Sequence, residues 1–294
     1  MKFITFKYDG KQQIGILSKD NHHVIPIKSI GVNYNDMNTL IEKITDSEMN
    51  ILRSSLKGKN CEYINIDDIT LLAPIPNPKQ DMICLGINYL AHAEESARYK
   101  KEAFGGDRPY PVYFSKRVGE ANTPNGYIPR YENIVDSLDY EAELAVIIGK
   151  DAKNVSRENA YDYVFGYTII NDVSARNLQT QHKQWYFGKS LDGFTPMGPC
   201  IVTKDEFVNP PALKITSKVN GELRQNSNTK LMIHSIDYVI NELSQGITLK
   251  AGSIIATGTP AGVGMGFQPP RFLNSGDVVE CEIEGIGCIR NIVK

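Results

Sequence analysis

Residues 139–148, which read DYEAELAVII, decide how the rest of the chain is interpreted. Their apolar and β-branched side chains predict a β-strand, in which successive side chains point to opposite faces. Glu141 and Glu143 therefore share one face, and the apolar neighbours take the other. Two adjacent carboxylates in an apolar strand repel each other and lose hydration, unless one is protonated or a cation lies between them. A divalent metal ion is the simplest remedy, and an edge strand with a solvated polar face is the alternative.

A third carboxylate favours the metal. Residues 167–171, YTIIN, predict a buried strand that ends at Asp172, directly before a helix that starts near Ser174. Side chains at strand ends converge on ligands while the scaffold holds them still. Three oxygen ligands suit Mg²⁺ or Mn²⁺, and these segments contain no histidine or cysteine, which disfavours zinc. Taken alone, Asp172 is equally well explained as a helix cap.

The helix predicted over residues 175–182 brings polar side chains to one face, because Arg176, Gln179 and Lys183 follow at i, i+3 and i+7. Beside a metal, a guanidinium and an amide would clamp a carboxylate or an enolate. A solvated helix face is the alternative. Further along, Lys189 follows a glycine in a predicted loop. Residues 188–190 read GKS, the end of a Walker phosphate loop, but that motif also requires glycine at position 183, which is lysine here.

A candidate proton-transfer pair lies in the helix predicted over residues 89–99, before the pattern breaks at Gly105 and Gly106. His92 and Glu95 are three positions apart, so the carboxylate can orient the imidazole as a general base. A surface ion pair is the alternative.

The glycine-rich segment 257–266 follows an apolar strand and can approach a ligand closely. It lacks the G-x-G-x-x-G spacing and the following helix that a dinucleotide site needs.

The chain divides at a proline-rich segment. Short strands at 2–8, 12–18 and 23–27 predict a small meander, followed by helical patterns at 37–44 and 47–56. Three prolines between positions 74 and 78 predict a connector. We therefore expect a small N-terminal α+β domain at 1–73, a connector at 74–80 and a β-rich domain at 81–294. Strands dominate the last part, with helices predicted at 157–164, 175–182 and 235–244.

Composition excludes several classes of function. The 294 residues include 32 Lys and Arg against 34 Asp and Glu, so no basic surplus exists to bind nucleic acid. The five cysteines form no C-x-x-C pair, which is typical of a reducing compartment. No signal-type run and no stretch of about 18 apolar residues occurs, so we expect a cytoplasmic protein without a membrane partner.

Taken in order, these segments resemble the fumarylacetoacetate hydrolase family. The matching pieces are residues 86–89 with His92 and Glu95, 114–116, 139–144, 171–176, Gln179, 188–190 and 258–264. The resemblance implies a mixed β-sandwich-roll catalytic domain, a small N-terminal domain and a homodimer. It also implies that Glu141, Glu143 and Asp172 hold Mg²⁺ or Mn²⁺, that Lys116, Arg176, Gln179, Lys189 and Thr259 bind substrate, and that His92 and Glu95 lie on a lid helix. Asn177 departs from the family pattern, in which many members have aspartate.

The family acts on 2-oxo acids and their enols, so the resemblance implies cleavage of the C3–C4 bond of a small 2-oxo acid through a metal-stabilised enolate. Oxaloacetate decarboxylation and acylpyruvate hydrolysis come first. In hydrolysis His92 would activate water; in decarboxylation Lys189 or the His92–Glu95 pair would position the departing carboxylate or protonate the enolate. The alternatives are an isomerase or hydratase of a 2-hydroxy-dienoate, a ureidoglycolate lyase and, from another class, a non-catalytic metal-bound scaffold or regulatory protein.

Overall fold

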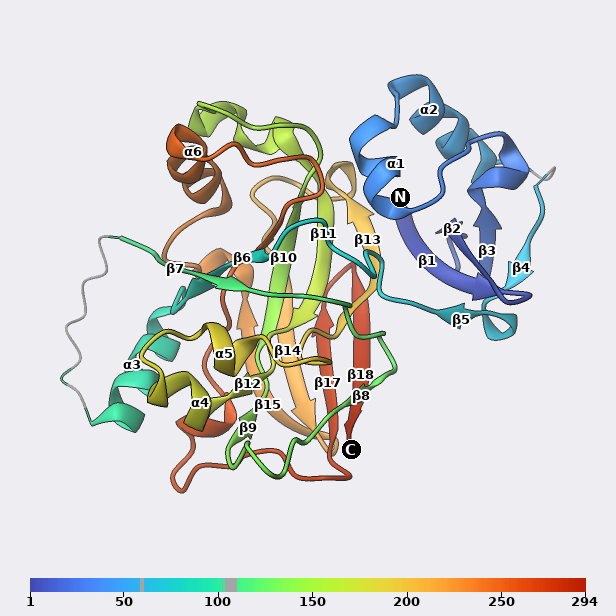
Figure 1. The fold of residues 1–294 in the computed structure, drawn as a ribbon. Coiled ribbons are helices and arrows are strands. Elements are labelled where there is room, and N and C mark those ends of the chain that lie inside the picture. Colours follow the sequence, from blue (N-terminus) through green and yellow to red (C-terminus); the bar gives the residue numbers. More distant parts are fainter. Residues whose placement is uncertain (59–60, 102, 104–109) are drawn as a thin grey trace.

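A computed structural model describes residues 1–58, 61–101, 103 and 110–294, and shows a β-rich α+β fold with mixed sheets, as the sequence predicts (Figure 1). The larger sheet contains, in spatial order, β4 (Ile64–Asn65), β3 (His23–Pro26), β2 (Lys11–Leu17), β1 (Lys2–Tyr8), β13 (Met197–Thr203), β11 (Val164–Asn171), β10 (Ala142–Ile148), β16 (Ile254–Ala256), β6 (Met82–Gly86) and β7 (Val112–Lys116), with β5 (Thr70–Leu71) beside β1. The second sheet contains β15 (Glu222–Asn228), β14 (Lys214–Val219), β17 (Val278–Ile283), β18 (Gly287–Val293) and β8 (Tyr127–Ile128). A short ladder joins β12 (Ser174–Ala175) to β9 (Leu138–Asp139). The pairs β16–β6 and β18–β8 are parallel, which makes both large sheets mixed.

Strand β10 is buried on both faces. Leu144 and Val146 point into a core shared with the second sheet, whereas Ala145 and Ile147 point into a core shared with the N-terminal residues. This explains its nearly continuous apolar sequence, which is typical of strands covered on both sides. Since β10 lies between β11 and β16, the edge-strand interpretation of its two glutamates is excluded.

The N-terminal meander continues the large sheet. Strand β1 pairs with β13 through Lys2 opposite Val202 and Phe3 opposite Ile201. Two helices, α1 (Met37–Lys43) and α2 (Asp46–Ser55), lie with it at the upper right of Figure 1. Helix α2 begins with a capping box, in which the Thr45 side chain accepts from the Glu48 backbone and the Glu48 side chain accepts from the Thr45 backbone. Residues 74–80 form neither helix nor strand.

Three helices gather near the ends of β10 and β11. They are α3 (Leu90–Lys100), α4 (Arg176–Gln181) and α5 (Tyr186–Lys189), which lie together on one side of the molecule in Figure 1. The short 3-10 helix η6 (Gly264–Gly266) packs against α3. The remaining helical segments are η1 (Ile27–Ile30), η2 (Ile66–Asp68), η3 (Arg157–Tyr163), η4 (Lys204–Glu206), η5 (Thr229–Leu231) and α6 (Ile236–Gly246).

Three local predictions differ from the structure. Residues 157–163 form a 3-10 helix instead of an α-helix, and Lys189 ends helix α5 where a loop was expected. Strand β15 was not predicted, because Gln225 is its single buried residue. The helix predicted at residues 89–99 is confirmed as α3, and Gly105 and Gly106, where the pattern was expected to break, lie outside the described residues.

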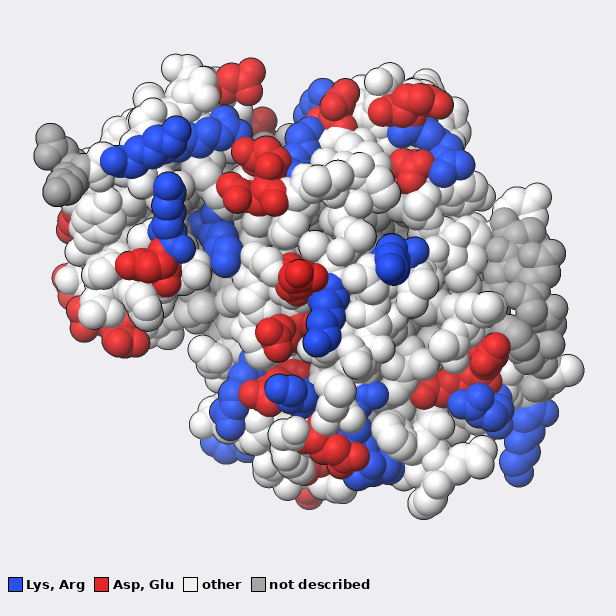
Figure 2. Space-filling view, turned by 180° about the vertical axis from the view of Figure 1, so that it is seen from behind, with Lys and Arg blue, Asp and Glu red and all other residues white. Residues whose placement is uncertain are grey.

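Positive and negative side chains are interspersed over the face in Figure 2, with no continuous basic surface there. No helix in the part of the chain that the structure describes has both the length and the apolar character to span a membrane.

Candidate active site

Three buried carboxylates converge where β10 and β11 meet. Glu141 directly precedes β10, Glu143 lies one residue inside it, and Asp172 directly follows β11. One oxygen from each of the three lies within 4.8 Å of the other two. Their residues are 5%, 1% and 0% exposed, respectively. The large sheet therefore places the predicted metal ligands together, at the end of its most buried strands.

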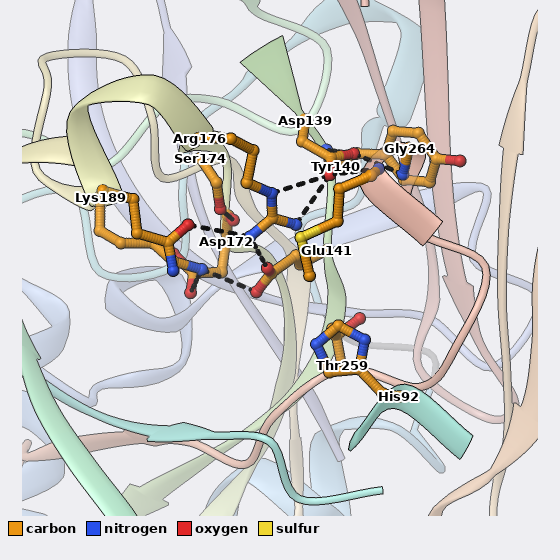
Figure 3. Close-up of polar contacts among 12 residues, drawn as sticks. His92, Asp139, Tyr140, Glu141, Asp172, Ser174, Arg176, Lys189, Thr259 and Gly264 are labelled. Atoms are coloured by element: carbon orange, nitrogen blue, oxygen red, sulfur yellow. Dashed lines mark hydrogen bonds and ion pairs between the residues drawn. The ribbon is translucent and has the colours of Figure 1, made fainter. Parts of the chain in front are cut away.

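Two lysines neutralise part of this cluster. The Lys189 ammonium donates to Glu141 Oε2 at 2.8 Å and to Asp172 Oδ2 at 2.7 Å (Figure 3). The Lys116 ammonium donates to Asp172 Oδ1 at 2.7 Å and to the carbonyl of Val173 at 3.2 Å. Both lysines are almost fully buried, so these contacts hold Asp172 in one orientation.

Arg176 lies between two carboxylates, as Figure 3 shows. Its Nε donates to Asp139 Oδ2 at 2.8 Å, and its Nη1 lies 2.7 Å from Glu141 Oε1 and donates to Gln179 Oε1 at 3.1 Å. Asp139 is fully buried and also accepts the backbone N–H groups of Gly264 and Met265 at 2.6 and 3.0 Å. One aspartate thus fixes both the guanidinium and the turn at η6.

The two glutamates of β10 have opposite electrostatic environments. Burial raises the pKa of Glu141, but the charges of Lys189 and Arg176 outweigh burial and hold that pKa well below its usual range. Burial and the charges of Asp172 and Glu141 raise the pKa of Glu143 well above its usual range. Lys189 and the Gly258 N–H, which donates to Glu143 Oε2 at 2.8 Å, offset these charges only in part, and a divalent cation fits there. Three carboxylates without histidine or cysteine match the hard oxygen ligands of Mg²⁺ or Mn²⁺.

His92 and Glu95 form a buried pair on helix α3. His92 Nδ1 lies 3.1 Å from Glu95 Oε2. In a neutral imidazole this contact favours the tautomer with the proton on Nδ1, facing the acceptor oxygen of Glu95, which leaves the Nε2 lone pair available as a base. Glu95 also accepts the backbone N–H of Gly262, at 2.9 Å to Oε1 and 3.2 Å to Oε2. A Cβ on Gly266 would overlap the Glu95 carboxylate, so glycine is required there for this approach. The surface-pair interpretation is excluded, since both residues are buried.

A buried glutamine fixes the hydroxyl group of Thr259, which is labelled in Figure 3. Gln225 Oε1 accepts the Ala142 N–H at 3.1 Å, so its amide nitrogen must face Thr259 Oγ1, 2.6 Å away, and donate to it. The Thr259 hydroxyl in turn donates to the Ala142 carbonyl at 2.9 Å. The proton of Thr259 is therefore already engaged by the backbone.

A strained turn connects β6 to helix α3. Ile87 has a φ of 61°, a left-handed conformation that β-branched residues rarely adopt. Asn88 holds this turn by donating to the carbonyls of His234 and Thr257 and accepting the His234 N–H. Because a Cβ on Gly86 would overlap the Trp185 ring, the tryptophan packs directly on the turn.

These groups surround a cavity of about 630 Å³. Seven of the predicted site residues line it, namely His92, Glu141, Glu143, Arg176, Gln179, Lys189 and Thr259. Glu95, Lys116 and Asp172 lie behind this lining and contact it through the bonds described above. All ten predicted residues are thus brought to one place, although Lys116 faces Asp172 and not the cavity. Their individual roles stay predictions.

Sequence reasoning missed three residues that shape the site. Asp139 was read only as a flank of the glutamate pair, although it accepts from groups 37, 125 and 126 positions away. Gln225 lies on the strand that was not predicted. Trp185, the single tryptophan of the chain, belongs to no motif. A lone tryptophan next to a polar helix face can nevertheless indicate an aromatic surface at a binding site.

Comparisons with known proteins agree with this geometry. Residues 81–294 match the family model described as fumarylacetoacetate (FAA) hydrolase C-terminal. The chain is 41% identical to the oxaloacetate tautomerase YisK of Bacillus subtilis (strain 168), over 99% of both chains. The solved structure of a fumarylacetoacetate hydrolase from Exiguobacterium antarcticum has 39% identity and a TM-score of 0.82, with 100% of this chain and 99% of that chain covered. A maleylpyruvate hydrolase from Sphingobium sp. SYK-6, solved with manganese(II) and pyruvate, has 28% identity and a TM-score of 0.79, covering 100% and 98%.

Proposed function

The chain belongs to the fumarylacetoacetate hydrolase family, and we propose that it is an Mg²⁺- or Mn²⁺-dependent enzyme that cleaves the C3–C4 bond of a small 2-oxo acid. One observation carries the proposal: three carboxylates meet within 4.8 Å of one another beside a cavity that Arg176, Gln179 and His92 also line. Oxaloacetate decarboxylation and acylpyruvate hydrolysis are the two forms of this reaction that we place first. The enzymatic nature of related chains and the manganese bound to the maleylpyruvate hydrolase support it.

Glu141, Glu143 and Asp172 would hold the cation, which when bound supplies a Lewis acid for the 2-oxo group and for negative charge at its oxygen. Lys189 lines the cavity and contacts two members of this set, Glu141 and Asp172, through its ammonium. Arg176 and Gln179 lie next along the same wall and would bind the substrate carboxylate.

His92 supplies proton transfer. In acylpyruvate hydrolysis its Nε2 takes a proton from water, whose oxygen adds to the C4 carbonyl. The C3–C4 bonding pair then moves to C3, and the proton held by His92 returns to that carbon. In decarboxylation C4 leaves as carbon dioxide and its bonding pair stays on C3. That carbon then takes a proton from the Lys189 ammonium or from His92 in its doubly protonated form, and solvent restores the proton to the donor. Glu95 keeps the proton of the imidazole on Nδ1 throughout, so that Nε2 faces the chemistry.

A second candidate is isomerisation, in which His92 moves a proton within an enol or dienol and no carbon–carbon bond breaks. The 41% identity to an oxaloacetate tautomerase favours it. It uses the same cation and the same base, so the two candidates differ only in whether C4 leaves. A cytoplasmic homodimer remains the expectation from the family resemblance.

The test is pyruvate release from oxaloacetate and from an acylpyruvate, with Mn²⁺ or Mg²⁺ and with EDTA, corrected for decarboxylation by the metal alone. Release above background that EDTA abolishes supports cleavage. Loss of the enol absorbance of oxaloacetate without pyruvate release supports the isomerase instead. Full activity in EDTA contradicts the metal assignment.

A further inference from the structure

The polar face of helix α4 extends from the carboxylate cluster towards solvent. Arg176, Gln179 and Lys183 all line the cavity, and they are buried, half-buried and exposed in that order. At a rise of about 1.5 Å per residue, α4 advances by about 7.5 Å from Arg176 to Gln181, and Lys183 lies two residues beyond its end. Lys183 follows the last turn of α4 with a φ of 59°, a conformation in which glycine is the usual residue. A lysine is therefore held at the cavity mouth by a backbone that does not favour it.

A second lysine lines the cavity from the opposite helix. Lys100 is the last residue of α3, and its ammonium lies 5.9 Å from the centroid of the Trp185 ring. Among the described residues that line the cavity, Glu141 and Glu143 are the acidic ones, and both lie at the carboxylate cluster. The mouth is therefore cationic, whereas the opposite end holds the predicted metal ligands.

The wall between these two ends is apolar. It is formed by Leu85, Ile87, Phe114 and Trp185, with the Phe114 and Trp185 rings 5.2 Å apart in an edge-to-face arrangement. This order of surfaces matches a ligand with a charged group at each end and a hydrocarbon chain between them. The cavity of about 630 Å³ lies in the range that holds molecules much larger than a four-carbon acid.

We propose that Lys100 and Lys183 form a subsite for the distal carboxylate of a dicarboxylic 2-oxo acid. The inference rests on the proposed function, because the 2-oxo end must be held at the carboxylate cluster. An extended chain advances roughly 1.2 Å per bond, so an acid of about six or seven carbons spans most of the distance along α4. The two lysines are thus specificity-determining residues that select long dicarboxylates over equally long monocarboxylates.

The experiment measures binding of two ligands by calorimetry to the Mn²⁺-loaded protein. 2-Oxoadipate and 2-oxohexanoate share the reacting end and differ in the distal carboxylate, and neither has a group at C4 that can leave. The variants are Lys183→Met, Lys100→Met, the double variant and Lys183→Arg, with Lys11→Met as a matched control on an exposed lysine of β2. Lys183→Gly removes the same charge and relieves the left-handed backbone, so its loss of preference cannot come from misfolding.

We expect the wild type to prefer 2-oxoadipate, each Met variant to reduce that preference about two- to fivefold, and the double variant to abolish it. Lys183→Arg should keep most of the preference, Lys11→Met should keep all of it, and added salt should reduce it because exposed ion pairs are screened. Equal affinity of the wild type for both ligands, or an unchanged preference in the double variant, overturns the subsite. So does failure of the Mn²⁺-loaded protein to bind 2-oxoadipate. Two other results would contradict the proposed function and not the subsite. One is that the Mn²⁺-loaded protein does not bind oxalate, a ligand that needs only the cation. The other is that no 2-oxo acid is turned over.

Discussion

Replacing Gly266 by alanine should disable the His92–Glu95 pair while leaving the fold intact. An alanine Cβ at this position would overlap the carboxylate of Glu95, which is the far end of a flexible side chain. The carboxylate can therefore swing away without moving the backbone. In doing so it loses the N–H of Gly262 and the Nδ1 of His92.

The size of the effect follows from these two contacts. Hydrogen bonds to a charged acceptor contribute about 1.5–3 kcal/mol each. The bond from Gly262 affects how firmly α3 is held, and the bond from His92 affects how the imidazole is oriented. We expect kcat to fall about 10- to 100-fold, which corresponds to about 1.4–2.7 kcal/mol in the barrier. The melting temperature should fall by only a few degrees, about 2–4 °C per kcal/mol for chains of this size.

The assay is steady-state turnover of whichever 2-oxo acid the wild type accepts, together with Mn²⁺ affinity and thermal unfolding. Gly119→Ala is the matched control, because a Cβ there meets nothing within 4 Å. A double-mutant cycle with Glu95→Ala isolates the cause, since Gly266→Ala should cost nothing more once the carboxylate is gone. Wild-type turnover in Gly266→Ala, or additive losses in the cycle, would refute the reasoning.

Three further outcomes test the rest of the site. Glu143→Gln should abolish Mn²⁺ binding in calorimetry and pyruvate release together, because it removes the carboxylate whose charge the chain offsets only in part; tight Mn²⁺ binding by the variant would contradict this. His92→Ala should lower turnover about 100-fold or more while Mn²⁺ affinity stays near wild type, and an unchanged rate would remove this base from the mechanism. Gly188→Ala should destabilise the protein by about 1–3 kcal/mol, since its Cβ would lie 2.5 Å from the backbone nitrogen of Gln179 and push Lys189 away from the cluster. Chemical denaturation measures this loss, and an unaltered midpoint would show that α5 tolerates the shift.

Much of the fold follows from local patterns in the sequence. The alternation in residues 139–148 predicts which side chains of β10 share a face, and the two cores confirm it. The first strand, predicted at residues 2–8, has these same ends in β1. By contrast, α5 is only four residues long, too short for helical periodicity to appear. Strand β15 is polar at most positions, and its best signal was the Asn220-Gly221 turn that precedes it.

The site residues likewise include some that local patterns predict and some that they do not. Spacing along the chain brings Glu141 to Glu143 and His92 to Glu95, because both pairs are local. The contacts of Asp139 with Arg176 and Gly264 join segments far apart in sequence, so no local pattern predicts them. The same holds for Lys116, whose ammonium faces Asp172 across 56 positions and not the cavity. Tertiary packing determines which residues form these long-range contacts, and local patterns in a single sequence do not predict that packing.

The separation between strand-borne and helix-borne residues in the cavity has a consequence for protein engineering. Glu143 lies on β10, which both cores bury, and Glu141 directly precedes that strand, so the proposed reacting end is rigid and intolerant of change. Thr180 and Lys183 line the cavity from a six-residue helix and the turn after it, where side chains reach solvent. A combinatorial library confined to those outer positions could therefore retarget the enzyme to acids of other lengths or charges. Selection would then act on substrate range while the reaction itself is kept constant.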